Sequence, residues 1–214
     1  MIFLSSDQHF YHKSVIRFCG RPFKDMDHMH ETLIANHNSV VGPDDTVYHL
    51  GDFSFKAGEI PGILSRLNGK NILLPGNHDD CWKLKTKYET AVARFKRYGF
   101  VDVLTEPTDI IVEGMLGFMQ HLPCLGDGDL RYPELRKTPE EYAKTYRFLL
   151  HGHQHELQCT RTDGNLIQIN VGVDQWNYTP VSYTTIEELI KEKVIELQNG
   201  KVELPKQRNM VRSG

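Results

Sequence analysis

Four short apolar runs in this sequence are each followed, within a few residues, by side chains that can bind metal ions. The runs lie at residues 2–4, 47–50, 72–74 and 148–150. Runs of this length are typical of strands buried in a parallel sheet, and α/β proteins bind ligands where such strands end. The sequence therefore predicts an α/β fold with a cluster of polar side chains at one edge of a sheet.

Five polar blocks occur along the chain in a fixed order. They are Asp7-Gln8-His9, Gly51-Asp52, Gly76-Asn77-His78-Asp79, His121 and Gly152-His153-Gln154-His155. Their order and residue types resemble the calcineurin-like metallophosphoesterase superfamily, whose pattern runs D-x-H, G-D, G-N-H-D/E, H and G-H-x-H along one domain. Each block alone is common by chance, but five in this order over about 150 residues form a specific match. The resemblance covers residues 1 to about 182, and the last thirty or so residues carry no motif of the family.

The resemblance implies the metallophosphoesterase fold, a four-layer αββα sandwich of two mixed β-sheets flanked by helices. We expect a single domain over residues 1–214, with the motif-bearing core at about 1–182 and a C-terminal helix and tail at 183–214. Periodicity and turn residues predict helices at 14–18, 27–41, 59–67, 84–98, 139–143 and 185–197. Later strands are expected at 101–104, 110–113, 116–120 and 166–171. The polar stretch 122–146 is expected to cover the site as a lid.

A two-metal site is the second implication of the resemblance. By analogy Asp52 bridges two divalent ions. The ligands completing one ion are Asp7, His9 and His155, and those completing the other are Asn77, His121 and His153. Mixed imidazole and oxygen ligands suit manganese, iron, zinc or nickel better than calcium or magnesium, and manganese is the expected ion.

Family analogy makes His78 the catalytic histidine, because it follows a ligand residue without being a ligand itself. It would stabilise charge on the phosphate or protonate the leaving oxygen. In the phosphoprotein phosphatase branch this histidine is oriented by a carboxylate three residues after the bridging aspartate. Here that position is Phe55, which counts against a protein Ser/Thr phosphatase, and Asp79 is the remaining candidate for orienting His78.

Three cationic or imidazole side chains are candidates for substrate binding: His12, Arg17 and Arg21. A guanidinium can receive a non-bridging phosphate oxygen through two parallel hydrogen bonds. The remaining histidines are expected to be structural. We predict that His49 and His151 pack in the core and that His28, His30 and His37 face solvent. Asn170 is expected just outside the ligands, with Trp176 and Tyr178 either stacking on a base or packing in the core.

The function implied by the resemblance is hydrolysis of phosphodiesters or small phosphate esters, of nucleotide type, by a hydroxide that bridges the two ions. Diesters are favoured over monoesters because the arginine and aspartate elements of the protein phosphatases are missing. One alternative is a nuclease acting on single strands, with residues 83–97 or 122–146 lining a groove. The other is a non-catalytic binding module on the same fold. Proteins of that kind lose metal ligands, whereas this chain retains them.

Bulk composition limits the partners and the compartment. The net charge of -3 argues against a broad basic surface that binds the backbone of nucleic acid. A small phosphate ester is therefore the favoured partner. The four cysteines are scattered without a C-x-x-C pair, the N-terminus does not resemble a signal peptide, and no apolar stretch is long enough to span a membrane. A soluble cytoplasmic protein is therefore expected, whereas the oligomeric state has no signature in the sequence.

Overall fold

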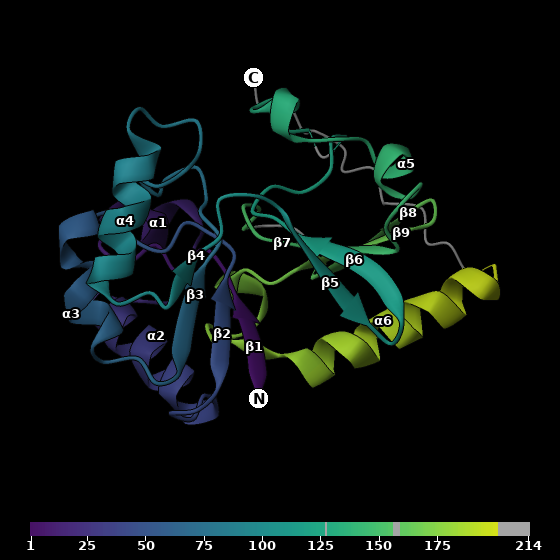
Figure 1. Ribbon diagram of the computed structural model, residues 1–214. Helices are drawn as coiled ribbons and strands as arrows, with labels where there is room; N and C mark the ends of the chain where they lie inside the picture. The colour runs from purple at the N-terminus through teal and green to yellow at the C-terminus, as the bar shows by residue number, and fades with distance from the viewer. Residues whose placement is uncertain (127, 156–158, 201–214) are drawn as a thin grey trace, which may run out of the picture.

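Two five-stranded mixed sheets pack against each other in the computed structural model, which describes residues 1–126, 128–155 and 159–200. The strand order is β10-β1-β2-β3-β4 in the first sheet and β5-β6-β7-β9-β8 in the second. Helices flank the pair of sheets (Figure 1). This arrangement confirms the expected sandwich of two mixed sheets with outer helices.

The first sheet brings three of the polar blocks to one edge. Its parallel strands are β1 (Ile2–Ser5), β2 (Thr46–His49), β3 (Lys70–Leu73) and β4 (Asp102–Val103), and β10 (Val181–Ser182) pairs antiparallel with β1. The helices on its outer side are α1 (Lys13–Phe18), α2 (Met26–Val40), α3 (Ile60–Leu64) and α4 (Tyr88–Tyr98), at the left of Figure 1. Because Ser5, His49 and Leu73 pair in register, the loops that follow these strands leave the sheet side by side.

The second sheet contributes the other polar blocks. Its strands are β5 (Thr108–Val112), β6 (Met115–Met119), β7 (Phe148–His151), β8 (Thr160–Asp163) and β9 (Leu166–Asn170). The three central strands β6, β7 and β9 are parallel, and antiparallel β5 and β8 form the edges. The short α5 (Pro139–Tyr142) packs Tyr142 into a cluster with Phe118 and Leu149. The long α6 (Tyr183–Gln198) inserts Ile186 and Ile190 into the layer between the sheets.

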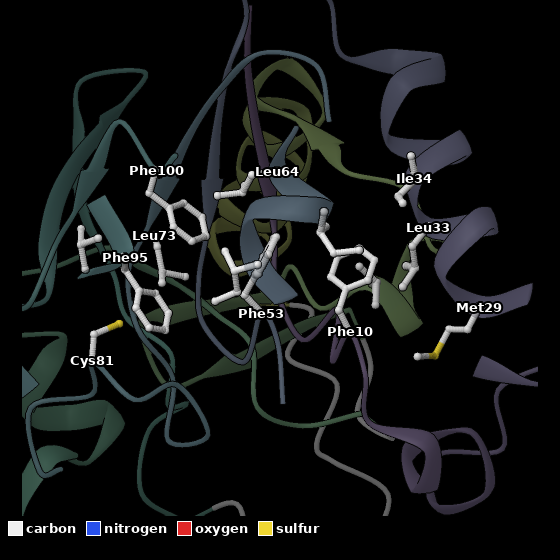
Figure 2. Close-up of a cluster of buried hydrophobic side chains, with 14 of the residues drawn as sticks. Phe10, Met29, Leu33, Ile34, Phe53, Leu64, Leu73, Cys81, Phe95 and Phe100 are labelled. Carbon is white, nitrogen blue, oxygen red and sulfur yellow. The ribbon is translucent and has the colours of Figure 1, made fainter. Parts of the chain in front are cut away.

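Buried aromatic residues anchor the loops that carry the polar blocks. Phe10 directly follows His9, and Phe53 directly follows Asp52; their side chains are 1% and 0% exposed. Their ring centroids lie 5.3 Å apart inside the cluster beneath the outer helices, which Figure 2 shows together with Phe95. Because an aromatic side chain that is fully buried is costly to move, each of these residues fixes the backbone of the polar residue before it.

The start of α4 and the burial of two histidines in α2 differ from the sequence prediction. The helix expected from residue 84 begins at Tyr88, because Lys87 adopts a left-handed conformation with φ 66° that a right-handed helix excludes. The histidines of α2 also differ: His28 is exposed as expected, but His30 and His37 are 6% and 4% exposed. His30 accepts a hydrogen bond from the Tyr11 amide, and His37 bonds the Asn68 carbonyl. Each buried ring therefore keeps a hydrogen-bond partner.

His49 and His151 are buried in their strands, as the sequence predicts. His49 is bonded at both ring nitrogens, with Nε2 2.8 Å from Asn71 Oδ1 and Nδ1 2.9 Å from Gln8 Nε2. Because Gln8 Nε2 can only donate, the His49 proton sits on Nε2. Burial lowers the pKa of His49 to about 3. The neutral ring therefore supports Gln8, the middle residue of the first polar block.

Acid should destabilise the fold through His49. Its pKa is lower in the folded state than in the unfolded state, so its contribution is complete above pH ~6.5 and is lost as the pH falls toward 3. Replacement by glutamine should reduce the pH dependence of the free energy of unfolding by roughly 1 kcal/mol per pH unit in this window. Urea unfolding of the metal-free wild type and His49→Gln at several pH values measures the difference. Identical pH slopes would contradict this account.

Candidate metal centre

The polar blocks of both sheets converge at the carboxyl ends of the parallel strands. Two groups of potential metal ligands result: Asp7, His9 and His155, and Asp52, His121 and His153. Within each group the candidate ligand atoms all lie within 4.8 Å of one another. Each group combines residues that follow strands of the first sheet with residues that follow strands of the second, so the site lies between the two sheets.

The second group brings ring nitrogens and side-chain oxygens together around one position. His121 Nδ1 lies 2.7 Å from the Leu50 carbonyl and donates to it, so Nε2 faces the other members of the group. This Nε2 lies 3.1 Å from Asn77 Oδ1, 3.3 Å from His153 Nδ1 and 3.4 Å from Asp52 Oδ2. Burial lowers the pKa of His121, but the Asp52 carboxylate raises it to about 9, so in the absence of a cation a proton on Nε2 occupies this position. Converging imidazole, amide and carboxylate acceptors fit a divalent cation.

The first group contains two buried atoms that lack a protein partner. Asp7 Oδ1 and His9 Nε2 have no hydrogen-bond partner among the described residues and lie 3.9 Å apart. Burial lowers the pKa of His9 well below its usual value, so the ring is neutral and offers a lone pair. His155 is held by a hydrogen bond of 2.7 Å from Nδ1 to Asp174, and one of its ring nitrogens lies within 4.8 Å of the candidate ligand atoms of Asp7 and His9. Orphaned buried acceptors are rare in proteins, and a bound cation would satisfy these.

Asp52 lies between the two groups. Its Oδ2 is 3.7 Å from His9 Nε2 in the first group and 3.4 Å from His121 Nε2 in the second. Its Oδ1 accepts a hydrogen bond of 2.9 Å from the His78 amide, which holds the carboxylate in this orientation. One carboxylate oxygen of Asp52 therefore lies close to a candidate ligand nitrogen of each group.

The glycines of the polar blocks allow the loops to approach each other. A Cβ on Gly76 would lie 2.2 Å from Asp52 Oδ1, and a Cβ on Gly152 would lie 2.3 Å from Asp7 Oδ2. Four candidate ligands adopt left-handed φ angles that side chains rarely tolerate, and these are Asp7 (59°), His9 (53°), Asp52 (53°) and His153 (71°). Each such residue costs on the order of 1–3 kcal/mol, and strain of this kind clusters at functional sites.

His78 and His12 lie at the exposed mouth of the site. The His78 side chain is 39% exposed, with Nε2 4.0 Å from Asp52 Oδ2. The His12 ring lies 5.1 Å from that of His9 and stacks on Phe55, with centroids 4.2 Å apart. Both histidines are thus beside the candidate ligands, where a substrate could reach them.

The structure corrects the expected role of Asp79. This residue is completely buried, and its carboxylate accepts hydrogen bonds from the backbone amides of Asp52, Phe53 and Gly76. It therefore ties the G-D loop to the G-N-H-D loop and does not orient His78. Burial, together with the nearby Asp52 charge, raises the pKa of Asp79 to about 7.

Arg21 is also not placed to bind a substrate phosphate. Its guanidinium is buried and donates to both Asp174 oxygens at 2.8 Å and to the carbonyls of Asp7 and Gln8. These hydrogen bonds fix the backbone of the first polar block, Asp7-Gln8-His9. Arg17 is exposed on α1, where its guanidinium lies 5.4 Å from the Phe18 ring, and within the described part of the chain its side chain forms no hydrogen bond or ion pair with a candidate ligand.

Two carboxylates of the site have no role in the sequence analysis. Asp174 bonds both His155 and Arg21, and Asp129 bonds His153 at 2.8 Å. Asp174 closes the Asn170–Asp174 stretch, so its position after a buried strand was an available signal. Asp129 lies in a polar stretch without periodicity, where nothing distinguishes it from other acidic residues.

Residues 170–178 support the site from outside the ligands, as expected for Asn170. Its side chain donates to the Gln154 carbonyl and accepts from the Gly172 amide, which connects β9 to the G-H-x-H loop. Trp176 donates to the Asn170 carbonyl and packs against the core between the sheets, and Tyr178 packs against Phe23. Core packing is therefore the role of both aromatic residues.

The fold and the two groups of ligand-type residues define a metallohydrolase-like protein. The chain belongs to the calcineurin-like phosphoesterase superfamily, whose domain matches residues 1–188. Membership makes the protein a metal-dependent phosphoesterase. The match ends inside α6, slightly beyond the end of the motif-bearing core expected at about residue 182.

Three relatives cover most of the chain. An uncharacterized protein of Methanocaldococcus jannaschii is 32% identical over 205 residues, covering 92% of this chain and 96% of the relative. The Gene 66 protein of Mycobacterium phage L5 is 30% identical over 191 residues, covering 80% and 86%. A crystal structure of a protein of unknown function from Aquifex aeolicus is 27% identical, with a TM-score of 0.67, and covers 88% of this chain and 98% of that one.

The helices of the described segments, 1–126, 128–155 and 159–200, include none with the length and apolar character needed to cross a bilayer.

Proposed function

We propose that this protein hydrolyses phosphodiesters, with nucleotide-type esters as the favoured substrates, at a dinuclear centre of divalent transition-metal ions. The observation that carries the proposal is the position of Asp52, whose Oδ2 lies between His9 and His121 at 3.7 and 3.4 Å. Manganese is the proposed ion, and iron, zinc and nickel are suited to the same ligands.

When bound, such a pair of ions supplies an activated water and positive charge for the phosphate oxygens. Asp52 is proposed to hold both ions. Asp7, His9 and His155 would hold one, and Asn77, His121 and His153 the other. His78, outside these ligands but beside Asp52, is proposed to donate a proton to the leaving oxygen or to stabilise its charge.

Two surface features next to the candidate ligands support a diester. One is Phe55, which is 51% exposed, stacks on His12 at an interplanar angle of 13° and lies 5.5 Å from the His78 ring. The other is a recess of about 400 Å³, including space open to solvent, which is lined by His121, Trp82 and Leu122, among others. A phosphodiester has two substituents, and each feature is proposed to receive one of them.

Phe55 should contribute to the binding of substrates with a flat ring. Base–aromatic stacking is worth about 1–3 kcal/mol, so Phe55→Leu should raise the KM for a cyclic mononucleotide by roughly 10-fold. The KM for a dialkyl phosphodiester should stay within about 2-fold of the wild-type value, because that substrate offers no ring to stack. Steady-state kinetics on both substrates measures the effect, and an equal change for both would contradict a stacking role.

A substrate panel tests the proposed function. Bis-p-nitrophenyl phosphate and p-nitrophenyl phosphate are each assayed with manganese, nickel, zinc and magnesium. We expect the highest turnover with manganese and a kcat/KM for the diester above that for the monoester. Absence of turnover with every ion would refute catalysis, and a preference for the monoester would refute the proposed substrate class.

The nuclease alternative has less support from the surface charges. In the basic stretch 83–97, Lys83 pairs with Glu106, Arg94 with Asp80 and Lys96 with Asp102. These pairs reduce the positive potential that a strand-binding groove needs. Comparing cleavage of a single-stranded oligonucleotide with that of a cyclic mononucleotide separates the two functions, and we expect faster cleavage of the cyclic mononucleotide.

A further inference from the structure

The stretch between β6 and β7 brings two oppositely charged side chains to the metal centre. Asp129 Oδ2 lies 2.8 Å from His153 Nε2, and Arg131 Nη2 lies 3.1 Å from the same nitrogen. The two residues follow His121 by eight and ten positions, and neither belongs to a motif of the superfamily. The stretch 122–146, which was expected to cover the site, therefore places two charged groups directly beside a candidate ligand.

Only one of the two contacts with His153 is a hydrogen bond. His153 Nδ1 faces His121 Nε2 at 3.3 Å, on the side where a cation would bind, so the ring proton lies on Nε2. That N–H donates to Asp129, because a guanidinium cannot accept a hydrogen bond. Arg131 reaches the ring through its own bonds to Asp129, from Nε at 3.0 and 3.1 Å and from Nη2 at 2.8 Å. One carboxylate thus organises both neighbours.

The loop that carries this carboxylate is held by a buried arginine. The side chain of Arg136 donates to the carbonyls of Pro123, Cys124 and Asp129. Arg136 is only 4% exposed. Three bonds from one rigid guanidinium connect the two ends of the loop, so the position of Asp129 is part of the fold.

Arg131 retains hydrogen-bonding capacity toward the mouth of the site. Its side chain is 60% exposed, and its Nη1 has no partner among the residues that the structure describes. We propose that Arg131 binds a non-bridging oxygen of the substrate phosphate, and that Asp129 is a positioning residue for both Arg131 and His153. This inference rests on the proposed function and assigns the phosphate-binding cation that Arg21 does not provide.

Different losses are expected when the two residues are changed. Arg131→Gln should bind inorganic phosphate about 10-fold or more weakly in the manganese-loaded protein and raise the KM for bis-p-nitrophenyl phosphate, with manganese affinity unchanged. Asp129→Asn should lower the manganese affinity by about 10- to 100-fold, because a partner of a ligating histidine is lost. Arg131→Lys should recover part of the phosphate affinity, since it keeps the charge without the planar fork.

Calorimetric titration of manganese, and of phosphate into the loaded proteins, measures both effects. Arg66→Gln is the matched control, because Arg66 also forms a two-pronged ion pair, with Glu31, and its loss should change neither affinity. Thermal unfolding of the metal-free variants checks that they fold. Wild-type phosphate affinity in Arg131→Gln, or wild-type manganese affinity in Asp129→Asn, would overturn the inference. A wild-type protein that binds no manganese would instead overturn the proposed function, and this inference with it.

Discussion

Asp52→Asn is expected to lower kcat/KM for bis-p-nitrophenyl phosphate by about 10³-fold or more. The asparagine keeps the shape of the side chain and can still accept from the His78 amide, which bonds Oδ1. It removes the negative charge between the two ligand groups. A loss of roughly 4 kcal/mol of electrostatic stabilisation corresponds to this factor. The assay is steady-state turnover with manganese.

The number of bound ions gives an independent readout for this variant. We expect two manganese ions per wild-type chain and at most one in Asp52→Asn, because neither group then has a shared carboxylate. Asp102→Asn is the control, since Asp102 forms an exposed pair with Lys96 and should affect neither turnover nor stoichiometry. Full stoichiometry and more than a tenth of the wild-type activity in Asp52→Asn would reject the bridging role.

His78→Ala is expected to lower kcat by about 10²- to 10⁴-fold without changing the number of bound ions. The side chain is 39% exposed at the mouth of the site, and it lies beside Asp52 without belonging to either ligand group. If His78 donates a proton, the loss should be greatest for esters with poor leaving groups. An alkyl leaving group should therefore suffer more than p-nitrophenol, which departs readily without a proton.

The comparison of leaving groups also distinguishes between the two proposed roles of His78. A loss that is equal for both esters would assign charge stabilisation to the ring and exclude general acid catalysis. His28→Ala is the control, because His28 is an exposed histidine of α2. Activity of His78→Ala within about 3-fold of the wild type for both esters would exclude either role.

Residues at the ends of parallel strands were the predictable part of this molecule. Asp7, Asp52 and Asn77 each follow a strand of one parallel sheet, and topology alone brings such positions together. The burial of His30 and His37 also had a signal. Together with Leu33 they are spaced by three and seven residues, the spacing of one face of a helix, and this stripe packs inward.

Contacts between distant segments could not be predicted in the same way. Arg21 looked suited to phosphate, but its partner Asp174 lies 153 residues away, and only the packed structure turns the guanidinium inward. Asp79 follows His78 directly, yet its carboxylate points to backbone amides of the neighbouring loop. Asp129 acts through a loop whose shape depends on Arg136. Local sequence patterns carry little information about such tertiary partners.

The division of the ligand groups between the sheets has a consequence for the thermal stability of the protein. Asp7 and His9 follow one sheet and His155 the other, and the same holds for Asp52 against His121 and His153. Cations held there would connect the two sheets. A bound ion would add about 2.7 kcal/mol to the free energy of unfolding at an ion concentration 100 times the Kd. The supply of metal would then govern how long the folded chain survives heat, as well as whether it can turn over substrate.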